Sequence, residues 1–213
     1  MPPSPCSDSE ACLVSLRDAE KRYGGKIALR TCSVELRRTE RLLITGGNGS
    51  GKSTLLRVLA GITPISSGQA TVSPEFDAMR VCYVPQVGGL YQNLTVIENA
   101  RALSHLVGAE TPKDLERQWY VRELGLDRFL QAKGAELSGG FQRLAAIACA
   151  LAARPQGLFL DEPLTGVDPE RAEMLLEGLK SPGGPQFLVV TDHSSARFPF
   201  ADRIVELPRG DAQ

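Results

Sequence analysis

Hydrophobic and polar positions alternate along the first part of the chain, which is the pattern of half-buried β-strands. The alternation is clear at Cys12–Leu16 and again at Cys32–Leu36. A polar break at Arg37–Glu40 separates these segments from the apolar run Leu42–Ile44, which predicts a buried strand. We therefore expect residues 11–45 to form an antiparallel β layer that leads into this strand.

Strand and helix patterns then follow one another, as they do in α/β proteins. The predicted strands are Ala70–Val72, Arg80–Val84, Gly157–Leu160, Phe187–Thr191 and Arg203–Leu207. The predicted helices are Thr54–Ala60, Ser138–Ala153 and one that begins after Asp168, with Pro169 at its first position. The core of the chain is accordingly predicted to be an α/β fold.

The stretch Leu94–Lys133 has no strong strand pattern and is predicted to be helical. Thr95 and Thr111 are candidate N-terminal caps within it. We expect a helical subdomain at about residues 90–138, inserted in a single domain that covers residues 11–209. Residues 1–10 lack the basic and apolar regions of a signal peptide and are expected to be a disordered tail.

Composition excludes several classes of protein. The 24 basic and 25 acidic residues among 213 leave no charge excess that would favour nucleic acid or an anionic membrane surface. The five cysteines are odd in number and show no C-x-x-C spacing, which favours free thiols in a reducing compartment. The longest nearly apolar run, Leu144–Ala153, is about half of what spans a bilayer, so we do not expect the chain to cross a membrane by itself.

The main chemical motif lies directly after the apolar run Leu42–Ile44 and fits the phosphate-binding pattern G-x-x-x-x-G-K-[ST]. Its residues are Gly46, Gly47, Asn48, Gly49, Ser50, Gly51, Lys52, Ser53 and Thr54. Glycines allow backbone N–H groups to turn towards a polyanion at a helix N-terminus. Lys52 is expected to reach the β- and γ-phosphates, and Ser53 to offer its hydroxyl to Mg²⁺. The alternative is a glycine-rich turn that matches by accident.

Two carboxylates, Asp161 and Glu162, end the predicted strand Gly157–Leu160. In a phosphate-loop nucleotidase, a carboxylate in the position of Asp161 orients Mg²⁺ and its waters. Glu162, directly after it, could polarise an attacking water as a general base. A solvated acidic turn would be the simpler interpretation if the phosphate loop were absent.

A third motif, Leu137-Ser138-Gly139-Gly140, precedes the long predicted helix. A serine cap followed by two glycines leaves backbone N–H groups free to meet an anion, although a plain helix cap would look the same. With these residues in view, the chain closely resembles the ATP-binding-cassette (ABC) ATPase family. The phosphate loop, Gln loop, LSGG signature, acidic Walker B strand, D-loop and switch histidine occur in the family's order, from about Cys12 to Leu207.

The resemblance implies roles for four further residues. Tyr23 matches the aromatic residue that stacks on adenine, although a tyrosine packed in the β layer is an alternative. Gln86 matches the loop residue that contacts Mg²⁺ or water and the transmembrane partner. Asp168 ends the D-loop Leu164–Asp168, and its role as a helix cap could by itself explain it. His193 matches the switch histidine that contacts the γ-phosphate.

The resemblance also implies the fold and the mechanism. The fold would be a P-loop NTPase core with a mixed, mainly parallel sheet, an N-terminal antiparallel β layer and an inserted helical subdomain. Two chains would form a head-to-tail dimer that holds ATP and Mg²⁺ between the phosphate loop of one and the signature of the other. The catalytic residues would be Lys52, Gln86, Glu162 and His193. The metal ligands would be Ser53, Gln86 and Asp161. Besides the phosphate loop, the nucleotide would be contacted by Tyr23, Ser138, Gly139, Gly140 and Asp168.

Three residues of the predicted signature helix depart from the family pattern. Phe141 replaces the usual glutamine, and Leu144 and Cys149 stand where arginines are common. Ser138 and the glycines are retained, so nucleotide contact is expected to survive. The departures leave open how the signature is coupled to the helical subdomain.

We expect the chain to be the ATP-binding subunit of an ABC transporter, held at the cytoplasmic face of the inner membrane by a separate integral membrane subunit. The segment Leu90–Asn99 is similar to that of bacterial exporter-type cassettes, and the small size is similar to haem-exporter subunits, which favours export. The alternatives are a soluble clamp, for example in iron–sulfur assembly, or a cassette that binds ATP without hydrolysing it. Glu162 and His193 argue against the last, and balanced charge argues against a nucleic-acid partner.

Overall fold

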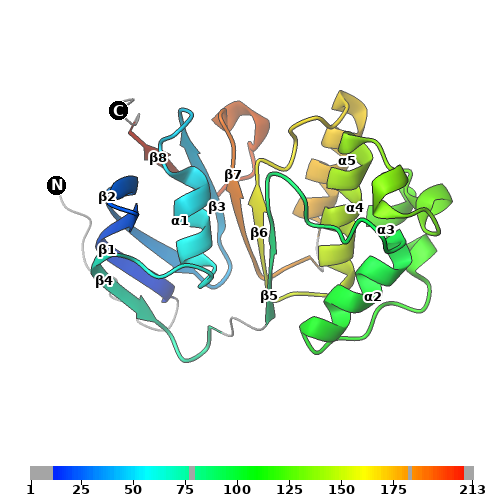
Figure 1. Cartoon of the computed structure of the whole chain (residues 1–213), viewed down its shortest axis with the longest axis horizontal. Coiled ribbons are helices and arrows are strands. Elements are labelled where there is room, and N and C mark those ends of the chain that lie inside the picture. Colours follow the sequence, from blue (N-terminus) through cyan, green and yellow to red (C-terminus); the bar gives the residue numbers. More distant parts are fainter. Residues whose placement is uncertain (1–11, 77–79, 182–183, 209–213) are drawn as a thin grey trace.

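The computed structural model describes residues 12–76, 80–181 and 184–208, so the predicted tail at residues 1–10 lies outside the described residues. Two sheets form the framework: a three-stranded antiparallel sheet of order β2-β1-β4 and a five-stranded sheet of order β5-β6-β7-β3-β8. The strands are β1 Cys12–Tyr23, β2 Lys26–Arg37, β3 Arg41–Gly46, β4 Ser67–Val72, β5 Val81–Val84, β6 Gly157–Asp161, β7 Phe187–Thr191 and β8 Arg203–Leu207. Figure 1 shows the antiparallel layer at one end of the molecule and the helices α2–α5 at the other.

The antiparallel layer confirms the prediction from the alternating N-terminal segments. Strands β1 and β2 pair antiparallel, and β4 pairs with the other edge of β1. The turn between β1 and β2 is formed by Gly24 and Gly25, both at positive φ, as a two-residue hairpin with right-handed strand twist requires. The strand β3 does not belong to this layer, because it pairs with β7 and β8 in the other sheet.

Every pairing in the five-stranded sheet is parallel, and its central strands β6, β7 and β3 are buried on both faces. On β3, Leu42 and Ile44 face the cluster that contains α1 and the antiparallel layer, whereas Leu43 belongs to the cluster on the helical side. Parallel strands covered on both faces need continuous apolar runs, which explains Leu42–Ile44 and Phe187–Thr191. The fold class predicted from the sequence is confirmed.

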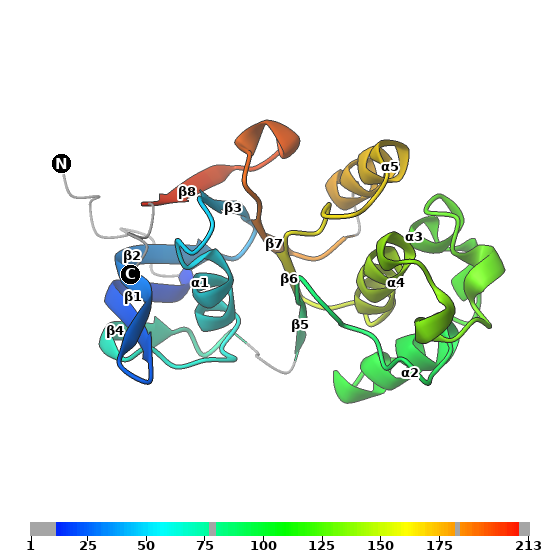
Figure 2. The same cartoon turned by 45° about the horizontal axis from the view of Figure 1, so that its top comes forward.

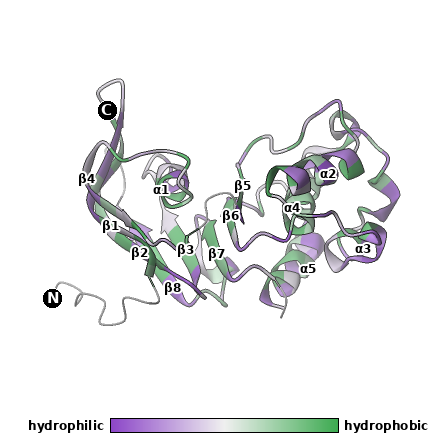
Figure 3. Ribbon diagram, turned by 90° about the horizontal axis from the view of Figure 1, so that it is seen from below, coloured by the Kyte–Doolittle hydropathy of each residue, from purple (hydrophilic) through white to green (hydrophobic). Residues whose placement is uncertain are grey.

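Helices cover the two faces of the parallel sheet unequally. The helix α1, Lys52–Leu59, buries Leu55, Leu56 and Leu59 between the antiparallel layer and the sheet. The other face carries α2 Val96–Leu106, α3 Trp119–Arg122, α4 Gly139–Ala152 and α5 Pro169–Lys180 (Figures 1 and 2). In Figure 3 the central parallel strands are largely hydrophobic, while hydrophilic residues lie on the outer helices. Among the described residues no helix is long and apolar enough to span a bilayer.

The segment predicted to be helical contains less regular helix than expected. Thr95 does cap α2, and with Glu98 it forms a capping box. The prediction of a second cap at Thr111 is wrong, since residues 109–112 form no helix. Only single turns follow, namely the 3₁₀ helices Leu115–Arg117, Asp127–Phe129 and Gly134–Glu136 besides α3. Asp168 caps α5 with Pro169 at its first turn, as predicted.

Candidate nucleotide site

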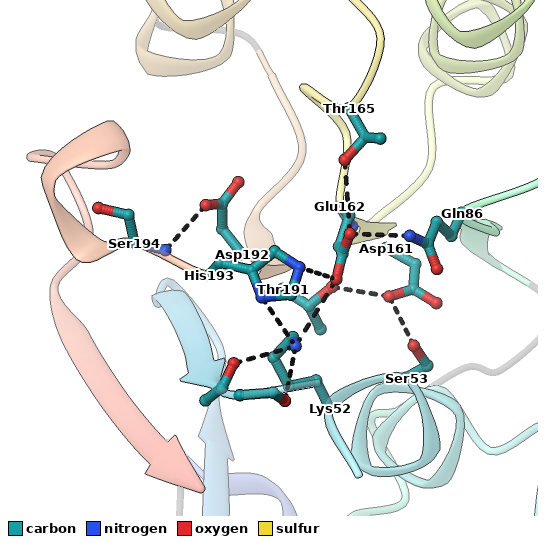
Figure 4. Close-up of polar contacts among 12 residues, drawn as sticks. Lys52, Ser53, Gln86, Asp161, Glu162, Thr165, Thr191, Asp192, His193 and Ser194 are labelled. Carbon is teal, nitrogen blue, oxygen red and sulfur yellow. Dashed lines mark hydrogen bonds and ion pairs between the residues drawn. The ribbon is translucent and has the colours of Figure 1, made fainter. Parts of the chain in front are cut away.

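The structure brings the main candidate residues together at the carboxyl ends of four neighbouring strands (Figure 4). The strand β3 leads into the phosphate loop, β6 ends at Asp161, and β7 ends at Thr191, two residues before His193. Gln86 follows the end of β5 by two residues. Ligands of open α/β sheets bind at this edge, because the loops that follow the strands converge there.

Two glycines of the phosphate loop are required by its backbone. Gly46 has φ 148°, and a Cβ there would lie 2.6 Å from Ser50 Oγ. Gly51 has φ 100°, and a Cβ there would lie 2.7 Å from the carbonyl oxygen of Ala28 in the antiparallel layer. The loop is thus wound tightly, and α1 begins at Lys52 immediately after it. The N-terminus of α1 therefore points its free N–H groups and its positive partial charge towards the loop.

Lys52 is 6% exposed, and its ammonium group lies at the centre of the cluster. Its Nζ donates to the carbonyl oxygens of Gly46 and Gly47 at 3.1 and 3.3 Å. It also lies 3.6 Å from Glu162 Oε1 and 3.5 Å from His193 Nδ1. One carboxylate is thus the only full negative charge within ion-pair distance of this buried cation among the described residues, and a polyphosphate would be a strong competitor for it.

Glu162 is buried and accepts hydrogen bonds from several elements. Gln86 Nε2 donates to its Oε2 at 2.8 Å, and Thr165 Oγ1 donates to the same oxygen at 3.4 Å. His193 Nε2 lies 2.8 Å from its Oε1. The backbone of Glu162 has φ 47°, an unfavourable conformation for a residue with a side chain. It is held there because its N–H donates to the carbonyl oxygen and to Oγ1 of Thr191, at 3.2 and 3.0 Å.

Asp161 and Ser53 form the part of the site that fits a magnesium ion. Ser53 Oγ donates to Asp161 Oδ1 at 3.0 Å. Hydroxyl and carboxylate oxygens are the ligands that Mg²⁺ prefers, and it usually keeps waters and phosphate oxygens in its remaining positions. The amide of Gln86, also predicted to be near the metal, donates to Glu162 instead. Among the described residues, Gln86 has no hydrogen bond to Ser53 or Asp161.

Two residues that support Asp161 were not predicted from the sequence. Thr191 Oγ1 donates to Asp161 Oδ1 at 2.7 Å, and Tyr83 OH donates to Oδ2 at 3.2 Å. Tyr83 in turn accepts from Arg57 Nε at 3.1 Å. Burial raises the pKa of Tyr83, so the phenol remains a proton donor to the carboxylate. A signal was available for Thr191, because it is the polar residue that ends an apolar parallel strand.

Asp192 and Arg143 were also missed, and each fixes a loop of the site. Asp192 is 2% exposed and accepts from the N–H of Ser194 at 2.9 Å, which fixes the turn that carries His193. Arg143 is buried and donates through Nη1 to the carbonyl oxygen of Pro85, directly before Gln86. Burial lowers the pKa of Arg143, while the charges of Asp161 and Glu162 oppose that shift. Neither contact could be inferred from local sequence.

The remaining predicted residues lie apart from this cluster. Tyr23 is at the end of β1, 47% exposed, with Lys21 Nζ 5.0 Å from the centre of its ring. Ser138 caps α4, and Ser138 and Gly139 are exposed. Asp168 is engaged by Arg171 at the start of α5. In the described part of the chain, no hydrogen bond or ion pair joins these residues to Lys52 or Glu162.

The chain is similar to known ATP-binding proteins of ABC transporters. A model of the family described as ABC transporter matches residues 29–165. The chain is 32% identical over 210 residues to the spermidine/putrescine import ATP-binding protein PotA of Roseobacter denitrificans, covering 94% of this chain and 58% of that protein. It is 33% identical over 177 residues to the Nod factor export ATP-binding protein I of Cupriavidus pinatubonensis, covering 79% and 54%. The chain thus spans less than two thirds of the length of these relatives.

A shorter relative and a solved structure match over most of both chains. The glutamine transport ATP-binding protein GlnQ of Bacillus subtilis is 29% identical over 212 residues, covering 93% of this chain and 88% of that protein. A dimeric bacterial ABC transporter cassette superimposes with a TM-score of 0.76 at 27% identity, covering 92% of this chain and 94% of that chain. Since the family model matches more than half of the chain, the protein belongs to the ABC transporter family.

Proposed function

We propose that the chain is the ATP-binding subunit of an ABC transporter and hydrolyses ATP in a head-to-tail dimer to drive translocation through a separate transmembrane subunit. The observation that carries the proposal is the convergence of Lys52, Gln86 and His193 on Glu162, beside the Ser53–Asp161 pair. A buried cation, a carboxylate base and a site for Mg²⁺ are the elements that phosphoryl transfer to water needs.

The positions of the residues support the roles that we assign to them. The backbone N–H groups of the phosphate loop and Lys52 would bind the phosphates, and Ser53 and Asp161 would hold Mg²⁺, which neutralises phosphate charge when bound. Glu162 would accept the proton of the attacking water. Gln86 and His193 bond to its two carboxylate oxygens and would therefore orient it. Tyr23, which is exposed at the end of β1 in the antiparallel layer, is our candidate for the adenine contact.

A second subunit would complete the site. The exposed N-terminus of α4 at Ser138 and Gly139 offers unpaired N–H groups and a positive partial charge, but it does not reach the cluster around Lys52 in its own chain. A head-to-tail partner would present this terminus, with Gly140 and Asp168, to the ATP held by the phosphate loop. The likeness to a cassette solved as a dimer supports this arrangement.

We further propose that a segment of the membrane subunit docks beside Gln86. The chain that follows Gln86 lines a cavity of about 300 Å³ together with α2, and Leu90, Tyr91, Leu103 and Leu106 are among its walls. Tyr91 and Leu106 are more than half exposed, and Val87 is 86% exposed. An apolar surface next to a catalytic-site residue could transmit docking to Glu162 through Gln86. Through this contact the chain would be held peripherally at the cytoplasmic face of the inner membrane.

The relatives carry both directions of transport in their names, import for PotA and export for the Nod factor protein. Export remains our prediction on the basis of the segment Leu90–Asn99. Identifying the membrane subunit would show which substrate is transported.

The test is hydrolysis of MgATP by the purified chain, with Lys52→Ala as the matched inactive variant, and detergent co-purification with an integral membrane protein. We expect turnover in the wild type, none above background in Lys52→Ala, and one membrane protein recovered with the chain. Absence of turnover in the presence of that partner would overturn the ATPase role. Recovery with only water-soluble proteins would favour the alternative of a soluble clamp.

A further inference from the structure

Phe141, the residue that departs from the family at the fifth signature position, is packed against two arginines and a second phenylalanine. Arg171 Cζ lies 5.0 Å from the centre of the Phe141 ring, and Arg128 Cζ lies 5.9 Å from it. The Phe129 ring is 4.7 Å away, centre to centre. Guanidinium groups within about 6 Å of an aromatic ring are attracted by its quadrupole, which a glutamine side chain lacks.

Arg171 connects Phe141 with two other parts of the chain. Its Nη1 donates to Asp168 Oδ2 at 2.9 Å, and its backbone N–H donates to Asp168 Oδ1 at 3.1 Å. Its Nε donates to the carbonyl oxygen of Leu124, in the helical segment, at 3.2 Å. One side chain therefore contacts the signature helix α4, the end of the D-loop and the segment after α3.

A second contact between the same two elements is made by backbone alone. A Cβ on Gly140 would lie 2.6 Å from the carbonyl oxygen of Gly166, in the middle of the D-loop. A Cβ on the neighbouring Gly139 would meet no atom within 4 Å. The second glycine of the signature is therefore required for the D-loop to lie directly on α4, whereas the first is not.

From these contacts we propose that Arg171 is a positioning residue that binds the D-loop Leu164–Asp168 to the N-terminus of α4 through Phe141. Ser138 and Asp168 are then carried by one rigid unit and reach the second subunit together. The proposal rests on the proposed function, because that function assigns Ser138 and Asp168 to the dimer. Phe141 therefore has a structural role in this chain, and replacing it by the usual glutamine would weaken the contact between the D-loop and the N-terminus of α4.

The test is a double-mutant cycle on the ATP-dependent dimer, in a Glu162→Gln background that slows turnover. Phe141→Leu, Arg171→Met and the double variant are compared by the dimer dissociation constant from analytical ultracentrifugation. We expect Phe141→Leu to weaken the dimer about fivefold, and to weaken it by a clearly smaller factor when Arg171 is already Met, since only the contacts of Phe141 with Arg128 and Phe129 are then left to lose. Independent, multiplying effects would overturn the proposal, as would unchanged dimerisation in Phe141→Leu.

Two controls separate positioning from general destabilisation. Phe141→Tyr keeps the aromatic face and should dimerise like the parent, whereas Phe141→Gln should resemble Phe141→Leu. Affinity for a fluorescent ATP analogue at protein concentrations below dimerisation should be the same in all variants, because the phosphate loop is untouched. Equal weakening by tyrosine and leucine would contradict a cation–π role.

Hydrogen–deuterium exchange of the monomer tests the same proposal without dimerisation. Phe141→Leu should speed exchange at residues 164–168 several-fold and leave the antiparallel layer unchanged. If the Glu162→Gln parent does not dimerise with ATP but this exchange rises, the dimer in the proposed function fails while the positioning role stands. Unchanged exchange in the D-loop would overturn the positioning role itself.

Discussion

The side-chain amide of Gln86 donates a 2.8 Å hydrogen bond to Oε2 of Glu162, joining the segment after β5 to the end of β6. The other carboxylate oxygen of Glu162 lies 2.8 Å from His193 Nε2. The proposed base is thus held from both sides by residues on two different loops. Because the segment after Gln86 also lines the apolar cavity beside α2, movement of that segment would reach Glu162 through a single hydrogen bond.

Replacing the proposed base should separate ATP binding from turnover. Glu162→Gln keeps the size of the side chain but removes its proton-accepting carboxylate, so we expect turnover to fall by about 10²- to 10⁴-fold. ATP affinity should be retained or increased, because a negative charge 3.6 Å from Lys52 is lost. Single-turnover hydrolysis and equilibrium ATP binding measure the two effects. The exposed carboxylate variant Glu177→Gln is the control, and turnover like that of the wild type in Glu162→Gln would remove the residue from this role.

Tyr83 should act through the metal, because it bonds to Asp161 and not to the phosphate loop. In Tyr83→Phe, Asp161 Oδ2 loses its hydrogen-bond donor and Arg57 loses its acceptor. Outer contacts of this kind typically change metal affinity by about 10- to 100-fold, so the Mg²⁺ concentration for half-maximal hydrolysis should rise by about tenfold. Titration of ATPase activity with Mg²⁺ measures it, with the exposed Tyr91→Phe as control. A change in maximal rate without a change in Mg²⁺ dependence would speak against this role.

The parts of this fold that the sequence predicts are those set by local rules. Periodicity located every strand of the parallel sheet, and cap chemistry located the starts of α2, α4 and α5. Contacts between distant segments could not be inferred, such as those of Arg143 with Pro85 and of Thr191 with Asp161. The prediction of a helix start at Thr111 was wrong. Gly108, at positive φ, lies just after the end of α2, and the chain beyond it forms only short turns such as Leu115–Arg117.

The three departures from the family pattern in the signature helix are explained only by the contacts that these residues make in the folded chain. Leu144 and Cys149 are 1% and 2% exposed on the face of α4 that packs in the core, so apolar residues suit both positions. Phe141, in contrast, is only partly buried and meets arginines. In α4, Leu144 and Cys149 therefore serve core packing, whereas Phe141 serves contacts with arginine side chains. The residue types alone do not distinguish these two roles.

The packing of α3 on α5 depends on a glycine. A Cβ on Gly178 would lie 1.9 Å from the ring of Trp119, so Gly178→Ala must displace the indole. We expect a loss of about 1–3 kcal/mol in the free energy of unfolding, as in other overpacked cores. Trp119 is the only tryptophan of the chain, so a shift of its fluorescence would report the displacement directly. In the control Gly184→Ala the new Cβ would lie 3.7 Å from Ser181 O, an ordinary contact, and equal destabilisation by both variants would contradict the prediction.

The buried thiols Cys82 and Cys149 should be almost inert in the folded protein. Burial raises the pKa of each thiol to about 12, against about 8.5 for an ordinary cysteine. The thiolate is the reactive form, so at pH 8 each of these two thiols should be deprotonated about a thousandfold less often in the folded chain than in the unfolded chain. Between pH 7 and 9 alkylation should rise steeply in the unfolded chain, whereas in the folded chain it should stay limited by opening of the core.

Pulsed alkylation with iodoacetamide, read by mass spectrometry of the peptides that contain each cysteine, tests this in native buffer and in guanidinium chloride. Cys149 is the sharper case, because it is 2% exposed and its Sγ lies 3.5 Å from the carbonyl oxygen of Val96, which ties α4 to the start of α2. Native labelling of Cys149 as fast as in denaturant would mean that α2 opens readily from α4. Slow labelling of Cys149 in the wild type, with faster labelling on destabilising α2 by Val96→Ala, would show that the core between these helices protects it.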